Sequence, residues 1–268
     1  MKLAKWIVLV LAALVAVPAA ADERVTLGWG RMFSNDAIGD GRDRWRTGGY
    51  QVSRVRGYSW NGQLPSALGE IFEFRATSQV IAPKSLSKAD PTDRRYAGVL
   101  SFGFHSQVDW KGNDLSLGAD MVIVGPQTGI SNFQSWIHNI LGMSKVNVTK
   151  DQIGNGIFPT LVAEAGRRVS FGEHLQVRPF LETQVGVETF VRAGGDLVIG
   201  SLGRDDMMVR DGITGQRYRA VEGTRDQGFS LVVGGDVARV FSSALLPSGG
   251  GAVMKDNRSR AGGTPAPE

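Results

Sequence analysis

Several segments of about ten residues alternate between apolar and polar side chains, and this pattern limits the fold more than any other feature of the chain. In the clearest segment, residues 99–110, one face carries Leu100, Phe102, Phe104, Val108 and Trp110. The other face carries Ser101, Gly103, His105, Gln107 and Asp109. Because successive side chains of a β-strand point to opposite sides of a sheet, one side of this segment suits an apolar environment and the other a polar one.

Three more segments repeat the alternation, at residues 72–80, 115–123 and 175–185. They place charged side chains in mid-strand, namely Glu73, Arg75, Arg178 and Glu182. An arginine in mid-strand that faces lipid costs about 2–4 kcal/mol, so these side chains are expected to point into a polar lumen. Weaker strands fit residues 24–30, 49–58, 161–169, 188–199 and 228–240, which brings the total to nine.

These strands predict an all-β fold, an antiparallel transmembrane β-barrel in which Phe72, Phe74, Phe102 and Phe104 face lipid. A soluble periplasmic β-sandwich is the alternative, since its strands alternate as well. In a sandwich, a second sheet would cover Phe102 and Phe104.

The N-terminal residues predict export. Lys2 and Lys5 precede an apolar run from Trp6 to Val17, and small residues follow at 19–21. This run is shorter than the roughly 20 residues that cross a bilayer as a helix, so residues 1–21 are interpreted as a signal peptide. Residues 22–241 then form the barrel.

Composition limits the choice of partners. The chain has no cysteine, so it must be held together by core packing or backbone pairing rather than by disulfides. Its net charge of +4 includes the two lysines of the signal peptide, which leaves 4 − 2 = 2 positive charges. This near-neutral balance gives no reason to expect nucleic acid as a partner.

The connections between strands differ in length. Residues 111–114 and 170–174 are tight turns, whereas 31–47, 83–95 and 125–159 are long. Short turns on one rim and long loops on the other are typical of outer-membrane barrels, so the long loops are expected to face outward.

The third long loop predicts one short amphipathic helix on the barrel rim. Ser131 is the expected N-cap and Gly142 the expected end. Apolar residues follow helical spacing at Phe133, Trp136, Ile137, Ile140 and Leu141. This apolar face is expected to bury itself against the rim or among acyl chains, with His138 on its flank.

The residues after Phe241 are rich in Gly, Pro and Ser, so 242–268 is interpreted as a linker-like tail, disordered or truncated. Bacterial outer-membrane barrels have an even number of strands. Nine strands therefore leave open whether others are hidden or whether the last ones are missing.

The first long loop carries oxygen ligands. Asn35 stands beside Asp36, and Asp40 and Asp43 follow among arginines and glycines. Carboxylate and amide oxygens are the ligands that calcium prefers, although a solvated polar loop has the same composition. His138 is the candidate general base for ester hydrolysis, and a structural histidine is the alternative. The sequence has neither a G-x-S-x-G elbow nor a histidine pair with zinc spacing.

Three motifs in order resemble one family. They are ND followed by DRWRTGGY in the first loop, DRRYAG at 93–98 in the second, and GPQTGISNFQSWIHNILG at 125–142 in the third. Together they are similar to the outer-membrane lipid A 3'-O-deacylases, over roughly residues 24–240. That resemblance implies a twelve-stranded barrel that uses Ca²⁺ to remove the 3'-linked acyloxyacyl chain of lipid A, by a mechanism likened to that of secreted phospholipase A2.

The resemblance also implies roles for single residues. Asn35 and Asp36 match the family's active-site pair, with Asp36 as metal ligand; Thr47 matches its hydroxyl residue and His138 its general base. One departure stands out, because the family's acidic residue six positions after the histidine falls on Ser144. Asp151 is a possible substitute.

Three hypotheses follow. The first is a calcium-dependent lipid A deacylase in the outer membrane, with its active site facing the outer leaflet. The second is an inactive barrel of the same family with a structural or lipopolysaccharide-binding role, and the third is a soluble periplasmic binding protein. The oligomeric state and the acyl-chain specificity stay open.

Overall fold

The computed structural model describes residues 23–35, 45–90, 92–143, 145–224, 229–246 and 253–256. Nine long antiparallel strands dominate it and correspond one by one to the nine predicted segments. They are β1 (Val25–Ser34), β2 (Trp45–Gly57), β3 (Phe72–Ala82), β4 (Ala97–Trp110), β5 (Asn113–Val124), β6 (Gly156–Gly166), β8 (Leu175–Val185), β9 (Glu188–Gly200) and β12 (Ser230–Ser243). The shorter elements are β7 (Val169–Phe171), β10 (Met207–Arg210), β11 (Arg217–Val221), β13 (Val253–Asp256), α3 (Ile130–Leu141) and the 3₁₀ turns η1 (Pro126–Thr128) and η2 (Val148–Asp151).

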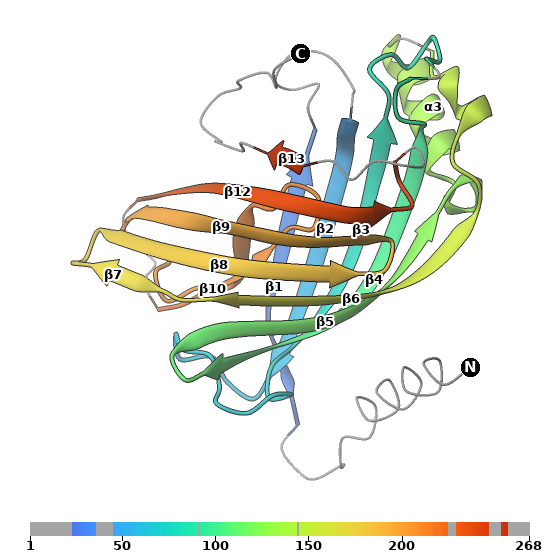
Figure 1. Ribbon diagram of the computed structural model, residues 1–268. Helices are drawn as coiled ribbons and strands as arrows, with labels where there is room; N and C mark the ends of the chain where they lie inside the picture. The colour runs from blue at the N-terminus through green and yellow to red at the C-terminus, as the bar shows by residue number, and fades with distance from the viewer. Residues whose placement is uncertain are drawn as a thin grey trace.

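The long strands form one meander. An 11-stranded sheet runs in the order β1-β2-β3-β4-β5-β6-β8-β9-β12-β13, and β7 also pairs with β8. The sheet curls into a half-barrel (Figure 1), and among the described residues β1 and β13 are its two edges. The predicted antiparallel barrel class is confirmed.

The two rims of the sheet differ. We call the rim where β1, β3 and β5 end, at Ser34, Ala82 and Val124, the helix rim, because α3 lies there (Figure 1). The opposite rim is where β2 and β4 end, at Gly57 and Trp110. Within the described parts of the chain, no helix is both long and apolar enough to cross a bilayer.

The alternation of the strands separates two environments. Glu73 and His105 face inward and are 0% and 1% exposed, whereas Phe74 and Phe102 face outward and are 47% and 54% exposed. The second sheet of the structure, β10–β11, lies on the inward side, where β11 contacts β1. No sheet covers Phe74 or Phe102 among the described residues, which contradicts the sandwich alternative.

The β10–β11 hairpin was not predicted, and its close packing on β1 depends on two glycines of β1. Gly28 and Gly30 on β1 turn toward β11, and a Cβ on Gly30 would lie 2.7 Å from the backbone oxygen of Arg219. A Cβ on Gly28 would meet the carbonyl of Ala220 at a still shorter distance. The two backbones therefore approach closely only because β1 has no side chains at these positions. The hairpin adds Met207, Val209, Tyr218, Ala220 and Val221 to a buried cluster with Val55 and Ile71.

The separation of short turns and long loops is less complete than predicted. The loops at 83–96 and 125–155 do lie at the helix rim. The opposite rim, however, carries two long connections as well as its tight turns, at 58–71 and 201–229. The helix rim in turn has one tight turn, at 186–187.

Two predicted segments fall mostly beyond the described residues. The signal peptide at 1–21 lies outside them entirely. Of the predicted tail at 242–268, Ser243 completes β12, Leu245 is 2% exposed in a core cluster, and β13 pairs with β12. The alternation pattern alone therefore placed the end of the sheet too early.

Candidate active site

The predicted helix is present as α3, but its first turn differs from the prediction. Gly129 is the N-cap, in a left-handed conformation with φ of 70°, and Ser131 lies inside the helix and is buried. Gly142 ends the helix as predicted, with φ of 65° and its N–H donated to the carbonyl of His138. Both ends of the helix need a residue in the left-handed conformation, which glycine adopts without steric cost.

The helix presents its polar side to the protein. His138 is 4% exposed, whereas Phe133, Trp136 and Ile140 are 60%, 58% and 62% exposed. Of the two places expected for the apolar face, the barrel rim is wrong, because that face points away from the protein, and burial among acyl chains stays a prediction. Instead, the side of the helix that carries His138 is buried against the protein.

The second loop motif holds this helix in place. The hydroxyl of Tyr96, itself 1% exposed, donates a hydrogen bond of 2.8 Å to Gln134 Oε1 on α3. A Cβ on Gly98 would lie 2.8 Å from the Cβ of Ile130, so this glycine lets the start of the helix pack directly on β4. Sequence reasoning gave Tyr96 and Gln134 no role, although DRRYAG was recognised as a motif and Gln134 lies four residues before His138.

The predicted site residues gather at the helix rim. Asn35 directly follows β1, and Thr47 lies in β2 opposite Val80 of β3. Val80 in turn pairs with Gly98, on which α3 begins. Since neighbouring strands lie about 4.8 Å apart, Thr47 and the start of α3 are separated by roughly two strand spacings. The structure thus brings Asn35, Thr47 and the helix of His138 to one rim.

The residues expected to hold calcium lie mainly outside the described chain. Asp36 is among residues 36–44, which the structure does not describe, and so is Ser144. Among the residues that it does describe, no group of three His, Asp or Glu side chains could hold a metal ion. Asp151 is exposed, and its contact with Arg95 is made by its backbone carbonyl. The fit of the first loop to calcium therefore stays a prediction.

Charged side chains of both signs gather at the mouth of the lumen, beside these residues. Arg46 forms an ion pair with Glu188, whose other carboxylate oxygen accepts a 2.9 Å bond from Ser243. Burial lowers the pKa of Arg94 in the second loop, and the neighbouring charge of Arg46 lowers it further. Arg46 and Arg94, which come from the first and second loop motifs, thus both lie close enough to the buried Glu188 to interact with its charge.

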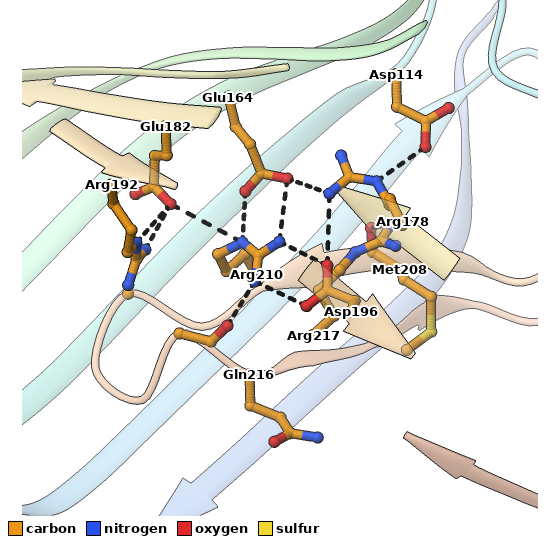
Figure 2. Close-up of polar contacts among 12 residues, drawn as sticks. Asp114, Glu164, Arg178, Glu182, Arg192, Asp196, Met208, Arg210, Gln216 and Arg217 are labelled. Carbon is orange, nitrogen blue, oxygen red and sulfur yellow. Dashed lines mark hydrogen bonds and ion pairs between the residues drawn. The ribbon is translucent and has the colours of Figure 1, made fainter. Parts of the chain in front are cut away.

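Below the mouth, the lumen is filled by ion pairs (Figure 2). Arg210 of β10 lies 2.5 Å from Glu164 on β6 and 2.7 Å from Asp196 on β9. Arg178 binds Glu164 as well, at 2.6 Å, and Arg192 binds Glu182 at 2.5 Å. This network fastens the β10–β11 hairpin to the wall of the half-barrel and leaves a lumen cavity of about 160 Å³.

A second histidine, His105, lines this cavity. Its Nε2 lies 3.1 Å from Asp120 Oδ1. Within the part of the chain that the structure describes, no serine or threonine hydroxyl hydrogen-bonds to His105. The pair therefore lacks the nucleophile that a Ser-His-Asp triad requires.

Comparison with known proteins fits this arrangement. The family model described as "Outer membrane protein LpxR" matches residues 7–259. The chain belongs to the LpxR family. The resemblance predicted from the three loop motifs is confirmed, and the family is one of outer-membrane proteins.

Among solved structures, LpxR from Salmonella typhimurium resembles this chain, with a TM-score of 0.65 and 18% sequence identity. The likeness covers 87% of this chain and 82% of that one. At this level of identity it supports the fold of this LpxR family member. A comparison with curated protein sequences gave no significant match.

Proposed function

We propose that this protein is a lipid A deacylase of the outer membrane, which hydrolyses the 3'-linked acyloxyacyl ester of lipid A with the help of calcium. The helix rim then faces the outer leaflet, where lipid A lies. His138 is the general base, Asn35 and Thr47 contribute to the same site, and Asp36 is a calcium ligand. The class of reaction is carboxylic ester hydrolysis.

The observation that carries the proposal is the orientation of α3 at the rim shared with Asn35 and Thr47. The helix turns His138 toward the protein and holds three large apolar side chains outward, at Phe133, Trp136 and Ile140. A helix on a barrel rim with this orientation can bury its apolar face among acyl chains. A catalytic imidazole on its inner side would then lie at the depth of the ester groups of lipid A.

The chemistry follows from these residues. A neutral imidazole of His138 would take a proton from water, which would then attack the ester carbonyl. Bound calcium would supply electrostatic stabilisation of the developing oxyanion. Arg46 and Arg94 at the mouth of the lumen bring two positive guanidinium groups near the site, next to Glu188 and Asp93. This charge suits a substrate that carries phosphate groups.

The direct test is mass spectrometry of lipid A from cells with and without the protein, together with two His138 variants. His138→Ala and His138→Gln are expected to lower deacylation about 10²-fold or more while leaving membrane insertion intact, because a general base contributes on this scale. His174→Ala is the matched control, since His174 is exposed beside the turn before β8. Normal turnover by well-inserted His138→Ala protein would overturn the catalytic assignment.

A second test concerns the metal. A chelator is expected to abolish deacylation and added calcium to restore it, and Asp36→Asn is expected to weaken the response to calcium. Full activity in excess chelator would contradict the calcium part of the proposal and leave the histidine part standing.

One observation favours a second candidate, an inactive barrel that binds lipopolysaccharide. Ser144 replaces the acid expected after the histidine, and the exposed Asp151 contacts Arg95 only through its backbone. Unchanged lipid A in cells that contain inserted protein, combined with retention of lipopolysaccharide by the purified protein, would support this candidate.

A further inference from the structure

Charged side chains are distributed unevenly over the outward face of the sheet. Within the strands from β3 to β9, the outward positions of the described residues carry no charge. Within the described strands and at their ends, three outward arginines, Arg24, Arg54 and Arg56, lie close together near the β1 edge at the opposite rim. We call this group the arginine patch.

The patch contains no negative side chain. Among the described residues, no carboxylate lies within ion-pair distance of Arg24, Arg54 or Arg56, whereas Arg178, Arg192 and Arg210 in the lumen all have such partners. Within the described chain, the three guanidinium groups of the patch therefore have no ion-pair partner. Each guanidinium has five N–H donors, so much of this hydrogen-bonding capacity is available to a ligand.

The three arginines are nevertheless held in position. Arg54 donates through Nε and Nη2 to the hydroxyl of Thr26, at 3.1 and 2.8 Å, and lies 5.4 Å from the ring centre of Trp29. The guanidinium of Arg24 lies 4.9 Å from the ring centre of Tyr58 and 5.0 Å from that of Phe72. These contacts limit the freedom of the side chains, which reduces the entropy lost when a ligand binds.

Neighbouring backbone completes the patch. Arg24 donates to the carbonyl of Gly69 at 3.0 Å, and Arg56 donates to the carbonyl of Arg24 at 2.5 Å. The Nε atoms of Arg24 and Arg56 are buried without a hydrogen-bond partner. Two guanidinium groups are thus tied to the chain by one nitrogen each while their charge stays unpaired.

The patch lies at the level of a membrane interface. Arg56 is next to Gly57, where β2 ends, and aromatic side chains near the same rim are exposed, such as Tyr58 at 40% and Trp110 at 57%. Girdles of aromatic residues mark the headgroup level of outer-membrane barrels. The patch, at the end of β2, therefore lies close to that level.

We infer that the arginine patch binds the phosphate group of an anionic phospholipid in the leaflet at the opposite rim. Guanidinium groups match phosphate oxygens in geometry and charge. Trp29 and Phe72 present apolar surface beside the patch, on which the acyl chains of the same lipid can lie. This site is separate from the proposed deacylase site, which lies at the other rim.

The test uses the full-length protein inserted in phosphatidylcholine vesicles, with phosphatidylglycerol added as the anionic probe. Retention of phosphatidylglycerol is measured by native mass spectrometry, and thermal unfolding is followed with and without it. Removal of each arginine as Arg54→Gln or Arg56→Gln is expected to weaken retention about fivefold, since each arginine near a membrane contributes about 1 kcal/mol to attraction of anionic lipid.

Two controls separate this site from general attraction between charges. Arg239→Gln removes another outward arginine, on β12 and over the ring of Phe241, but nearer the helix rim, and it is expected to leave retention unchanged. The double variant Arg54→Lys with Arg56→Lys keeps the charge and is expected to retain the lipid more weakly than the parent, because lysine lacks the planar fork.

The outcomes are distinct. Equal retention of phosphatidylcholine and phosphatidylglycerol, or equal losses for Arg54→Gln and Arg239→Gln, would overturn the inference. Displacement by inorganic phosphate alone, without preference for the lipid, would show an anion site and contradict the lipid assignment. None of these readouts depends on deacylase activity, so failure of the proposed function would leave this test unaffected.

Discussion

The inner and outer faces of the half-barrel use arginine in opposite ways. In the lumen, Arg178, Arg192 and Arg210 each lie within 4 Å of a carboxylate. On the outer face, Arg24, Arg54 and Arg56 have aromatic rings and carbonyl groups as neighbours instead. Charges on the inner side of the half-barrel need counter-charges nearby, because buried unpaired ions are costly. The outer face borders a membrane whose headgroups can supply them.

The largest effect is expected inside. Arg210→Ala removes one of the two arginines that bind Glu164 and Asp196, since only Arg178 then remains. The cost is expected to approach the roughly 3–5 kcal/mol of a broken buried ion pair. Unfolding in urea, followed in detergent or vesicles, measures the loss. Arg204→Ala is the control, because among the described residues Arg204 hydrogen-bonds only to the carbonyl of Gly172, at 2.8 Å. Equal losses for both variants would show that burial gives Arg210 no special role.

A smaller effect is expected when charge is placed on the outer face far from the edges. Phe102 near the middle of β4 is 54% exposed, so Phe102→Arg puts a guanidinium against lipid at a cost of about 2–4 kcal/mol. Phe102→Leu should cost much less, because it keeps the surface apolar. The measurement is the fraction of protein inserted in vesicles and its unfolding midpoint. If Phe102→Arg inserts as well as Phe102→Leu, the outer face of β4 does not meet lipid.

The smallest of the three effects concerns the packing of the β10–β11 hairpin on β1. Gly30→Val is expected to push β11 away from β1 and to cost about 1–3 kcal/mol, the usual range for overpacking. Limited proteolysis should then cut within residues 201–229 more readily. Gly195→Ala is the control, because a Cβ at Gly195 meets open space. Unchanged proteolysis of the Gly30→Val protein would mean that the hairpin does not depend on this close approach.

The contrast between the faces also explains what the sequence could predict. The nine wall strands were predictable because each has lipid-compatible residues on one side and polar residues on the other, as in Phe102 beside His105. The hairpin was not, because β10 has three successive apolar residues and β11 is only five residues long. Periodicity reports the two surroundings of a strand, and strands of four or five residues are too short to show it clearly.

The site shows the same limit. The order of the loop motifs predicted that Asn35, Thr47 and His138 share a rim, and the strand register places them there. The spacing of Phe133, Trp136 and Ile140 showed that they share one face of a helix, but not what that face meets. The direction in which this face points is determined by contacts between residues far apart in sequence, such as the hydrogen bond from Tyr96 to Gln134. No local pattern contains such a contact.

The packing of the β10–β11 hairpin on β1 also determines when the fold can be completed. Gly28 belongs to the first strand and Ala220 to the last third of the chain, yet their backbones are in contact. Bringing together segments so far apart in sequence makes folding slow, because the long loop between them must close first. The first strand would therefore leave the export machinery long before its inner partner, and assembly would have to wait for almost the whole chain.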